Sequence, residues 1–353
     1  MGYNQRLISS RFRNSMSAFV IGHPLRNVAL KHPLLAKLLW RLDFVLMWML
    51  IAVFRCLPVD AASRFGDRAM RWMGAFMKRK SGMFRGNLKI AFPQLSADEL
   101  EVLVSDAWGS AGRVLAEYPH LKTIREQEER LQIEILEPIV TYGQPDKPCI
   151  IVTAHLSNWE VIGSAMARMG IPNASLYSPP LNPYLDKLLL ESRQALNCEL
   201  YPRDNSARLL MRALKKGRTA AMVMDRRVEE GGKVVRFFGR DKPATLLPAK
   251  LALKFNCDLV PVQVERLQDA NFKVTFHPPI RPTQATANED EQALEMTQQI
   301  HEHFERWIQA NPGEWFCSKR VWSRPKRYLK QQALGKKALE EAREKASVDP
   351  YAV

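Results

Sequence analysis

In residues 149–160, CIIVTAHLSNWE, an apolar run is followed directly by a histidine, and a glutamate stands five positions after that histidine. The run is short, follows Pro148 and is rich in β-branched residues, which is typical of a buried central strand. The residues after it have helical spacing and stop at Gly170. We therefore expect His155 at the carboxyl end of a strand. In an open α/β sheet that edge binds ligands, and an imidazole there is suited to act as a base near pH 7.

The glutamate of this segment allows two interpretations. Ser157 and Glu160 match a capping box, in which both side chains satisfy amides at the start of a helix, and His155 is then an ordinary loop histidine. Residues five apart on one helix differ by roughly 140° and do not meet. If Ser157 caps the helix, however, His155 lies before it. The Glu160 carboxylate can then hold one ring nitrogen and leave the other free as a base.

The chain shows no motif for a covalent nucleophile, a nucleotide or a metal. There is no G-x-S-x-G elbow, no phosphate loop, no G-x-G-x-x-G and no C-x-x-C pair. We therefore predict neither a cofactor nor a metal site. The five cysteines are odd in number, which does not suggest a disulfide frame, and none stands beside a histidine in the sequence: Cys56, Cys149, Cys198, Cys257 and Cys317.

Four further segments accompany the H-x-x-x-x-E element in a fixed order. They are NLKIAFPQL at 87–95, YSPPLNPYLDKLLLESRQALNCELYPRDN at 177–205, MDRRVEEGGKVVRFFGRDKPAT at 224–245 and PGEWFCSKRVWSRP at 312–325. Together these five elements resemble the bacterial lipid A late acyltransferase family, the lauroyl and myristoyl transferases of the lysophospholipid acyltransferase superfamily. The resemblance runs through most of the chain.

The resemblance implies transfer of a fatty acyl chain from acyl carrier protein to a hydroxyl of a membrane-held glycolipid, a lipid A precursor. His155 would be the general base that deprotonates this hydroxyl, and Glu160 would be its partner. Because a thioester already carries a good leaving group, such an enzyme needs a base, oxyanion donors and a site that holds both lipids. The resemblance also gives five residues that we expect to bind substrate: Asn158, Arg193, Arg203, Asp225 and Arg226.

Other functions remain open at this point. The donor could be coenzyme A instead of acyl carrier protein, and the acceptor could be a lysophospholipid or a glycosylated phosphatidylinositol. A non-catalytic membrane-binding protein of the same fold is an alternative from another class, although intact His155 and Glu160 argue against it. Nucleic-acid binding has little support, because the basic clusters lack a recognisable nucleic-acid-binding module.

The amino end has a composition that favours membranes. Residues 1–42 hold seven Lys or Arg and no acid, and residues 34–57 are dominated by large apolar side chains. Lys37, Arg41 and Asp43 interrupt this second segment, whereas a spanning helix needs about 20 apolar residues. We expect the segment to associate with the membrane, as a single-pass or a monotopic element, at the cytoplasmic face of the inner membrane.

The formal net charge of +15 predicts an anionic partner. An anionic membrane surface is the simplest one, since Lys and Arg beside acidic headgroups gain roughly 1 kcal/mol each. An acidic carrier protein is another candidate.

The pattern predicts an α/β fold, with a mostly parallel sheet flanked by helices and an N-terminal helical membrane-associated region. We divide the chain into a membrane-associating segment (1–60), a helical region (61–130), an acyltransferase α/β domain (131–330) and a charged tail (331–353). We expect helices over 61–80, after Ser96 and over 288–310. The expected strands are 133–136, 149–154, 174–177, 219–224, 259–264 and 272–276.

Overall fold

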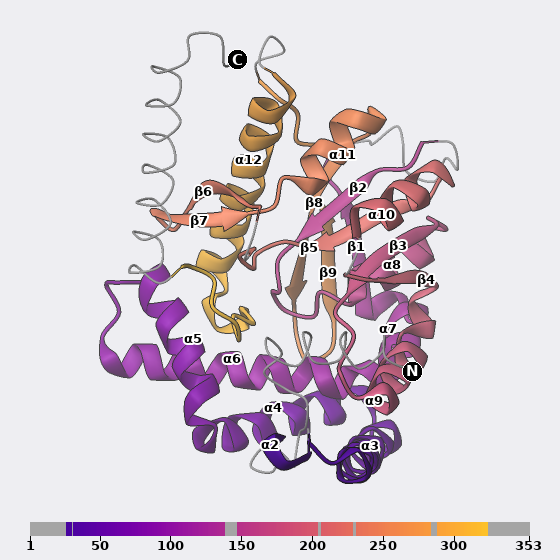
Figure 1. Ribbon diagram of the computed structural model, residues 1–353, viewed down its shortest axis with the longest axis vertical. Helices are drawn as coiled ribbons and strands as arrows, with labels where there is room; N and C mark the ends of the chain where they lie inside the picture. The colour runs from indigo at the N-terminus through magenta and orange to yellow at the C-terminus, as the bar shows by residue number, and fades with distance from the viewer. Residues whose placement is uncertain are drawn as a thin grey trace.

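The computed structural model describes residues 26–29, 31–137, 147–203, 206–228, 231–283 and 288–323. The predicted tail at 331–353 and residues 1–25 of the amino end lie outside the described residues. Helices of the N-terminal part gather at one end of the molecule, and a sheet covered by helices makes up the other end (Figure 1).

The sheet has seven strands in the order β1-β9-β8-β2-β5-β3-β4. All neighbouring pairs are parallel except β8 and β9, so the predicted, mostly parallel sheet is confirmed. All six expected strands are present. The strands are β1 (Leu131–Ile135), β2 (Ile150–Thr153), β3 (Asn173–Tyr177), β4 (Cys198–Pro202), β5 (Thr219–Val223), β8 (Leu259–Arg266) and β9 (Phe272–Phe276).

Strand β2 lies near the middle of the sheet, between β8 and β5, and all four of its residues are buried. Successive side chains of a strand point to opposite faces. Ile150 and Val152 accordingly belong to one hydrophobic cluster, and Ile151 belongs to another. Burial on both faces explains why this strand reads as a continuous apolar run.

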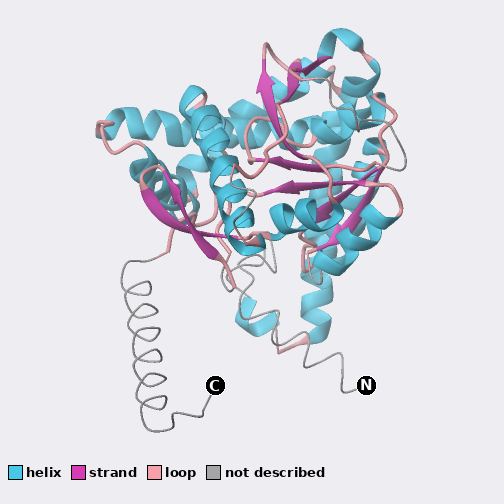
Figure 2. Ribbon diagram, turned by 90° about the horizontal axis from the view of Figure 1, so that it is seen from above, coloured by secondary structure: helices cyan, strands magenta, loops and turns pink. Residues whose placement is uncertain are grey.

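Helices cover both faces of the sheet, as Figure 2 shows from above. On one face α8 packs with Ile151, and on the other α10, α11 and α12 surround Ile150 and Val152. The expected helix over 288–310 is confirmed, since α12 begins behind an Asn288 capping box. The bounds are α8 (Val161–Arg168), α9 (Pro183–Ser192), α10 (Ser206–Lys215), α11 (Leu247–Phe255) and α12 (Glu289–Ala310), with 3-10 helices η3 (Arg193–Leu196) and η4 (Pro312–Glu314).

The N-terminal helices pack closely on one another. A Cβ on Gly66 of α4 would lie 2.4 Å from the carbonyl oxygen of Gly112 on α6, so this crossing requires glycine. The helix expected after Ser96 is present as α6, and it begins with a capping box formed by Ser96 and Glu99. The expected helix over 61–80 is instead divided at Met77. The bounds are α2 (Arg26–Ala29), α3 (Pro33–Cys56), α4 (Val59–Phe76), α5 (Lys78–Ala91), α6 (Ala97–Glu117), η1 (Tyr118–His120), α7 (Leu121–Glu126) and η2 (Glu128–Arg130).

Three strands were not expected from the sequence. Strand β4 is an edge strand of mixed polarity, and β6 (Lys233–Phe237) and β7 (Arg240–Ala244) form a separate antiparallel hairpin. Phe238 and Gly239 make the turn of this hairpin with φ of 50° and 65°, which matches a tight two-residue turn. Because the hairpin lies outside the main sheet, neither of its strands shows the long apolar run that marks the central strands.

Candidate active site

His155 and Asp225 meet at the carboxyl edge of the sheet. They follow the neighbouring parallel strands β2 and β5, whose carboxyl ends lie side by side. The Nδ1 atom of His155 lies 2.5 Å from Oδ1 of Asp225, and both side chains are buried. The indole Nε1 of Trp315 donates a 2.9 Å hydrogen bond to the other carboxylate oxygen. The expected position of His155 at a strand end is therefore confirmed.

The electrostatics keep this pair in the form that a general base needs. Burial alone would raise the pKa of Asp225, but the nearby His155, Arg226 and Trp315 bring that pKa below its usual value. Burial lowers the pKa of His155, although Asp225 opposes the shift. At neutral pH an ionised carboxylate therefore faces a neutral imidazole. Nδ1–H then donates to Asp225, and Nε2, which makes no hydrogen bond among the described residues, carries the lone pair.

The loop after β2 is held by the chain near residue 315. The Phe316 N–H donates to the carbonyl oxygen of His155, and the Ser157 N–H donates to that of Glu314. Ser157 has a positive φ of 52°. The predicted capping box is wrong here: α8 begins only at Val161, and Glu160 occupies its N-cap position without a side-chain cap bond. The loop contacts with the C-terminal segment take Ser157 away from the helix start.

Glu160 pairs with Arg193 and not with the imidazole. The guanidinium Nε of Arg193 donates a 3.0 Å hydrogen bond to one Glu160 oxygen, and its Nη2 donates to the other. The hydroxyl of Tyr118 also donates to this carboxylate, at 2.7 Å. The expectation that Glu160 holds His155 is corrected: Asp225 does so, because the doubly donating cation on η3 takes the Glu160 oxygens. Glu160 still acts on His155 through its charge, which opposes the stronger effect of burial on the imidazole pKa.

Asn158 is fully buried and supports the loop from inside. Its amide donates a 2.8 Å hydrogen bond to Glu117, and its oxygen accepts from the Glu160 N–H. Glu117, also fully buried, accepts further hydrogen bonds from Ser63 and Arg266, each at 2.6 Å. The expectation that Asn158 binds substrate does not fit this position, because a side chain with no exposed surface and both amide groups bonded cannot reach a ligand.

Arg203 and Arg226 lie along the same edge of the sheet. Arg203 follows β4 and is exposed, whereas Arg226 is partly buried directly after Asp225. The Nε atom of Arg226 is buried and has no hydrogen-bond partner among the described residues. Burial lowers the pKa of Arg226, and the nearby charge of Arg203 lowers it further. Neither arginine bonds to the imidazole, so the structure places them beside the His155–Asp225 pair rather than in it.

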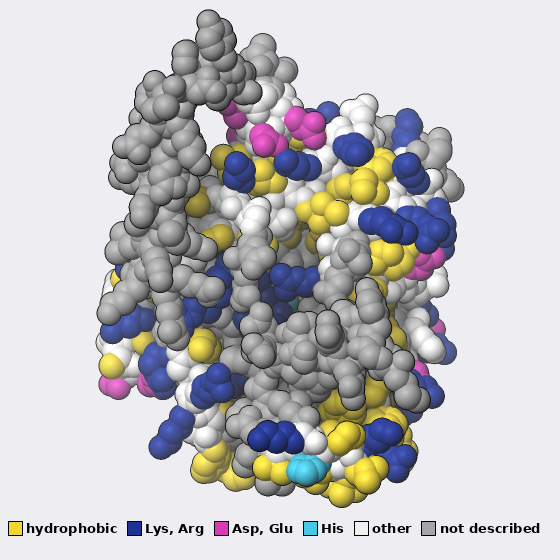
Figure 3. All heavy atoms as spheres, in the orientation of Figure 1, with side chains coloured by type: hydrophobic (Ala, Val, Ile, Leu, Met, Phe, Trp, Pro, Cys, Tyr) yellow, Lys and Arg dark blue, Asp and Glu magenta, His cyan; other side chains and the backbone are white. Residues whose placement is uncertain are grey.

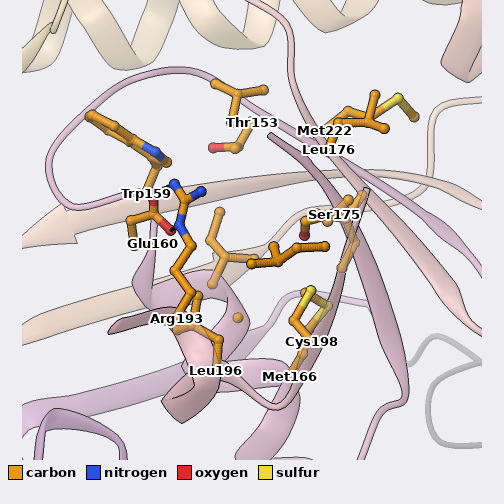
Figure 4. A pocket seen from close by; sticks show the side chains of 16 residues that line it. Thr153, Trp159, Glu160, Met166, Ser175, Leu176, Arg193, Leu196, Cys198 and Met222 are labelled. Atoms are coloured by element: carbon orange, nitrogen blue, oxygen red, sulfur yellow. Dashed lines mark hydrogen bonds and ion pairs between the residues drawn. The ribbon is translucent and has the colours of Figure 1, made fainter. Parts of the chain in front are cut away.

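A cavity of about 70 Å³ lies between the sheet and the layer of α8 and η3 (Figure 4). Glu160 and Arg193 form its polar side, and Trp159 lines it close to the base, with its ring centroid 4.9 Å from that of His155. The remaining wall is mostly apolar. It is formed by Ile151, Thr153, Ile162, Gly163, Met166, Ser175, Leu176, Leu196, Cys198, Leu200, Ala221, Met222 and Val223.

Three of the five cysteines are poorly suited to act as nucleophiles, namely Cys149, Cys257 and Cys317. Burial raises the pKa of Cys149 and of Cys257 to about 12, and it also raises the pKa of Cys317. The reactive form of cysteine is the thiolate. No cysteine sulfur is hydrogen-bonded to a histidine ring among the described residues. None of these three thiols therefore has the environment of a catalytic nucleophile.

Two residues of the site carried no clear sequence signal. Tyr118 begins η1 directly after α6 and meets Glu160, 42 residues later, only through tertiary packing. In the sequence, Glu117 was one more acid on an amphipathic helix, and nothing distinguished it from the others. Trp315 did carry a signal, because it stands within the aromatic and basic segment at 312–325, but its contact with Asp225 could not be inferred from that segment.

The sequence is similar to known proteins of one family. The family model described as bacterial lipid A biosynthesis acyltransferase matches residues 33–324. The lipid A biosynthesis palmitoleoyltransferase of Escherichia coli is 26% identical over 192 residues, which cover 54% of this chain and 62% of that protein. The lipid A biosynthesis lauroyltransferase of the same organism is 26% identical over 200 residues, or 55% of this chain and 61% of that protein.

A lipid A biosynthesis acyltransferase of Haemophilus influenzae is 21% identical over 246 residues, covering 68% of this chain and 76% of that protein. The family match spans most of the chain. It includes β2 and β5, the strands that position His155 and Asp225. The chain therefore belongs to the bacterial lipid A biosynthesis acyltransferase family.

Proposed function

We propose that this protein is an O-acyltransferase that moves a fatty acyl chain from acyl carrier protein to a hydroxyl of a lipid A precursor. The observation that carries the proposal is the buried His155–Asp225 pair at the carboxyl edge of the sheet. Family membership and the names of the relatives support an acyl acceptor of the lipid A type.

In the proposed reaction, Nε2 of His155 takes the proton of the acceptor hydroxyl as its oxygen attacks the thioester carbonyl. The new C–O bond forms, the C–S bond breaks, and the imidazolium returns its proton to the leaving thiolate. Asp225 stabilises the imidazolium and holds the ring through Nδ1–H, as the acid of a catalytic triad does. Because the thioester is already activated, this scheme needs no enzyme nucleophile.

Glu160 and Arg193 have a supporting role in this proposal. Their ion pair joins the start of α8 to η3, on one side of the cavity that lies next to Trp159. The Glu160 carboxylate of this pair lies near the imidazole without contacting it. Its negative charge favours the imidazolium that forms during the reaction. Arg203 and Arg226 are the described cations best placed to meet a negatively charged part of a substrate at this edge.

We also propose that the enzyme works on the cytoplasmic face of the inner membrane, bound through α3 and α4. No helix in the described parts of the chain is long and apolar enough to cross a bilayer. Large apolar side chains are nevertheless exposed on these helices: Leu34 (83%), Trp72 (69%) and Phe76 (67%) are the most open. Yellow and dark blue side chains alternate at this end of the molecule (Figure 3).

We call this surface the bilayer face. Its apolar members are Leu34, Leu38, Leu42, Val45, Leu46, Trp48, Met49 and Val53 on α3 and Phe65, Trp72, Met73 and Phe76 on α4. Exposed Lys37, Arg41, Arg64 and Arg68 stand among them. An apolar surface with interspersed cations is typical of helices that lie in the interface of an anionic membrane. Helix α4 thus joins the N-terminal segment in the proposed attachment.

The test is an acyl-transfer assay with purified protein, carrier-bound and coenzyme A thioesters, and a panel of acceptors. The panel contains a lipid A precursor, a lysophospholipid and a glycosylated phosphatidylinositol. We expect transfer to the lipid A precursor from the carrier-bound thioester. Transfer only to another acceptor would reject the proposed substrate, and absence of both transfer and thioester hydrolysis would favour a non-catalytic protein.

His155→Asn gives the sharpest variant for the same assay. An asparagine amide can still donate to Asp225, but it offers no basic nitrogen at the position of Nε2. We expect the rate to fall by a factor of roughly 100 to 10,000, the usual contribution of a general base, with little change in melting temperature. His303→Ala, which removes an imidazole on α12, is the matched control and should keep wild-type activity.

A further inference from the structure

A row of exposed cations follows one side of helix α10. Arg208, Arg212 and Lys215 stand at positions i, i+4 and i+7, so they share a face, and Lys216 continues the row beyond the helix end. We call these four residues the α10 stripe. Figure 3 shows Lys and Arg side chains gathered on the part of the surface where α10 lies in Figure 1. The opposite side of the helix is buried through Leu210, Ala213 and Leu214.

Within the part of the chain that the structure describes, no acid pairs with the stripe. Helix α10 contains no Asp or Glu, and no ion pair to the stripe is formed within the described ranges. The nearby Glu199 of β4 pairs with Arg218 at 2.9 Å instead. Like charges at helical spacing destabilise a helix, so the packing of the apolar side must offset their repulsion. Fold stability therefore gives no reason for this row, whereas an anionic partner would give one.

The stripe begins at the edge of the sheet that holds the active site. Helix α10 follows β4, and Arg203 stands between them at the strand end. From Arg203 the cations continue to Arg226, whose neighbour Asp225 holds His155. Three strand spacings of about 4.8 Å separate β4 from β2, so the two strand ends lie about 15 Å apart. A partner docked on the stripe needs a flexible arm to place a reacting group at His155.

The position of α10 separates the stripe from the bilayer face. Helix α10 packs against β3, β4, β5 and α11, while α3 and α4 lie at the other end of the molecule (Figure 1). A flat membrane that contacts α3 and α4 would therefore not cover α10. The anionic partner of the stripe must approach from the aqueous side.

We propose that the α10 stripe docks an acidic protein that carries the acyl donor on a flexible arm, and that Arg203 and Arg226 guide this arm toward His155. The inference rests on the proposed function, in which the donor is bound to a carrier protein. It adds the surface on which that carrier sits. Charge complementarity of this kind mainly raises the rate of productive encounter and weakens as salt screens it.

The experiment reverses the charge of the stripe in a triple variant, Arg208→Glu with Arg212→Glu and Lys215→Glu. The control triple, Lys89→Glu with Lys233→Glu and Lys254→Glu, changes net charge equally at exposed positions elsewhere. Each protein is assayed with the same acyl chain on acyl carrier protein and on pantetheine. For the stripe variant we expect KM for the carrier-bound donor to rise at least tenfold, with kcat and KM for acyl-pantetheine unchanged.

Added salt should raise KM for the carrier-bound donor in the wild type and in the control triple. In the stripe variant this KM should hardly change with salt. An unchanged KM for the carrier-bound donor in the stripe variant, or an equal rise in both triples, would overturn the proposal.

Binding of holo acyl carrier protein, measured by calorimetry, separates this proposal from the proposed function. If the wild type transfers no acyl group yet binds the carrier, and the stripe variant does not, the docking surface stands and the reaction is wrong. If the stripe variant loses binding to anionic vesicles but still binds the carrier, the stripe belongs to a membrane contact and the proposal is rejected.

Discussion

The indole Nε1 of Trp315 donates a 2.9 Å hydrogen bond to Oδ2 of Asp225, a residue 90 positions earlier in the chain. His155 lies on the other oxygen of the same carboxylate. With both oxygens engaged, the carboxylate has one orientation, and the imidazole that depends on it has one as well. The segment after α12 thus fixes the orientation of the His155 imidazole, which follows β2.

Trp315→Phe should keep the aromatic packing and remove the donor. A hydrogen bond to a charged group contributes about 1.5 to 3 kcal/mol, which corresponds to a factor of roughly 10 to 160 in rate if it acts in the transition state. We expect kcat to fall within that range while KM stays near the wild-type value. Trp322→Phe is the matched control, because its Nε1 donates to the Phe237 carbonyl in the same aromatic cluster. Equal losses in both variants would show that only packing is affected.

The activity should decrease on the acid side of a midpoint below pH 6.5. Burial lowers the pKa of His155 from its usual 6.5, and the base works only in the neutral form. As the pH falls through the lowered pKa, the imidazole gains a proton and kcat/KM declines. Asp225→Asn removes a charge that raises this pKa, so its profile should have a lower plateau and a midpoint at still lower pH. A midpoint that stays in place or moves upward in Asp225→Asn would contradict the pairing.

The Glu160–Arg193 ion pair should show strong coupling in stability. The side chains are 7% and 13% exposed, and loss of one partner leaves the other charge buried and unpaired. For Glu160→Gln we expect the free energy of unfolding to fall by about 3 to 5 kcal/mol, and similarly for Arg193→Gln. The double variant should lose less than the sum of the two. Urea unfolding of all four proteins measures the coupling; additive losses would mean that the pair contributes little.

The bilayer face should lose membrane affinity when its aromatic residues become polar. Burying a large apolar side chain contributes about 1.5 to 3 kcal/mol, so Trp72→Gln and Phe76→Gln should each weaken sedimentation with anionic vesicles by roughly tenfold or more. Val234→Gln and Leu267→Gln, at exposed apolar positions on β6 and after β8, are the controls. Activity on a detergent-dispersed acceptor should remain. Equal vesicle binding by all four variants would place the attachment elsewhere.

The sequence was most informative where a segment is buried on both sides. The run at β2 and the similar run at β5 each predicted a central strand, since continuous apolar residues have few other stable positions. His155 could be placed at a strand end for the same reason. The helix starts at Ser96 and Asn288 were also predicted, and in both the capping residues are neighbours within one helix turn.

Partners far apart in the chain were beyond this reasoning. The contact of His155 with Asp225 depends on β5 lying directly beside β2, an order that 65 intervening residues of other strands and helices do not reveal. The interpretation of Glu160 was wrong for the same reason. Its spacing from His155 suggested that the two side chains form a pair. Arg193 reaches it from a separate 3-10 helix. A local motif showed that a carboxylate was needed but not which one supplies it.

Asn87 on α5 is hydrogen-bonded to the last described segment of the chain. Its side-chain amide donates to the carbonyl oxygens of Cys317 and Lys319, and its oxygen accepts from the N–H of Val321. During translation these acceptors leave the ribosome more than two hundred residues after the asparagine. The helical layer and most of the sheet are thus synthesised before the segment that carries Trp315. A chain released early would contain His155 and Asp225 but lack Trp315, whose hydrogen bond orients the carboxylate, so the pair would reach its final geometry only after the segment at 312–325 has been made.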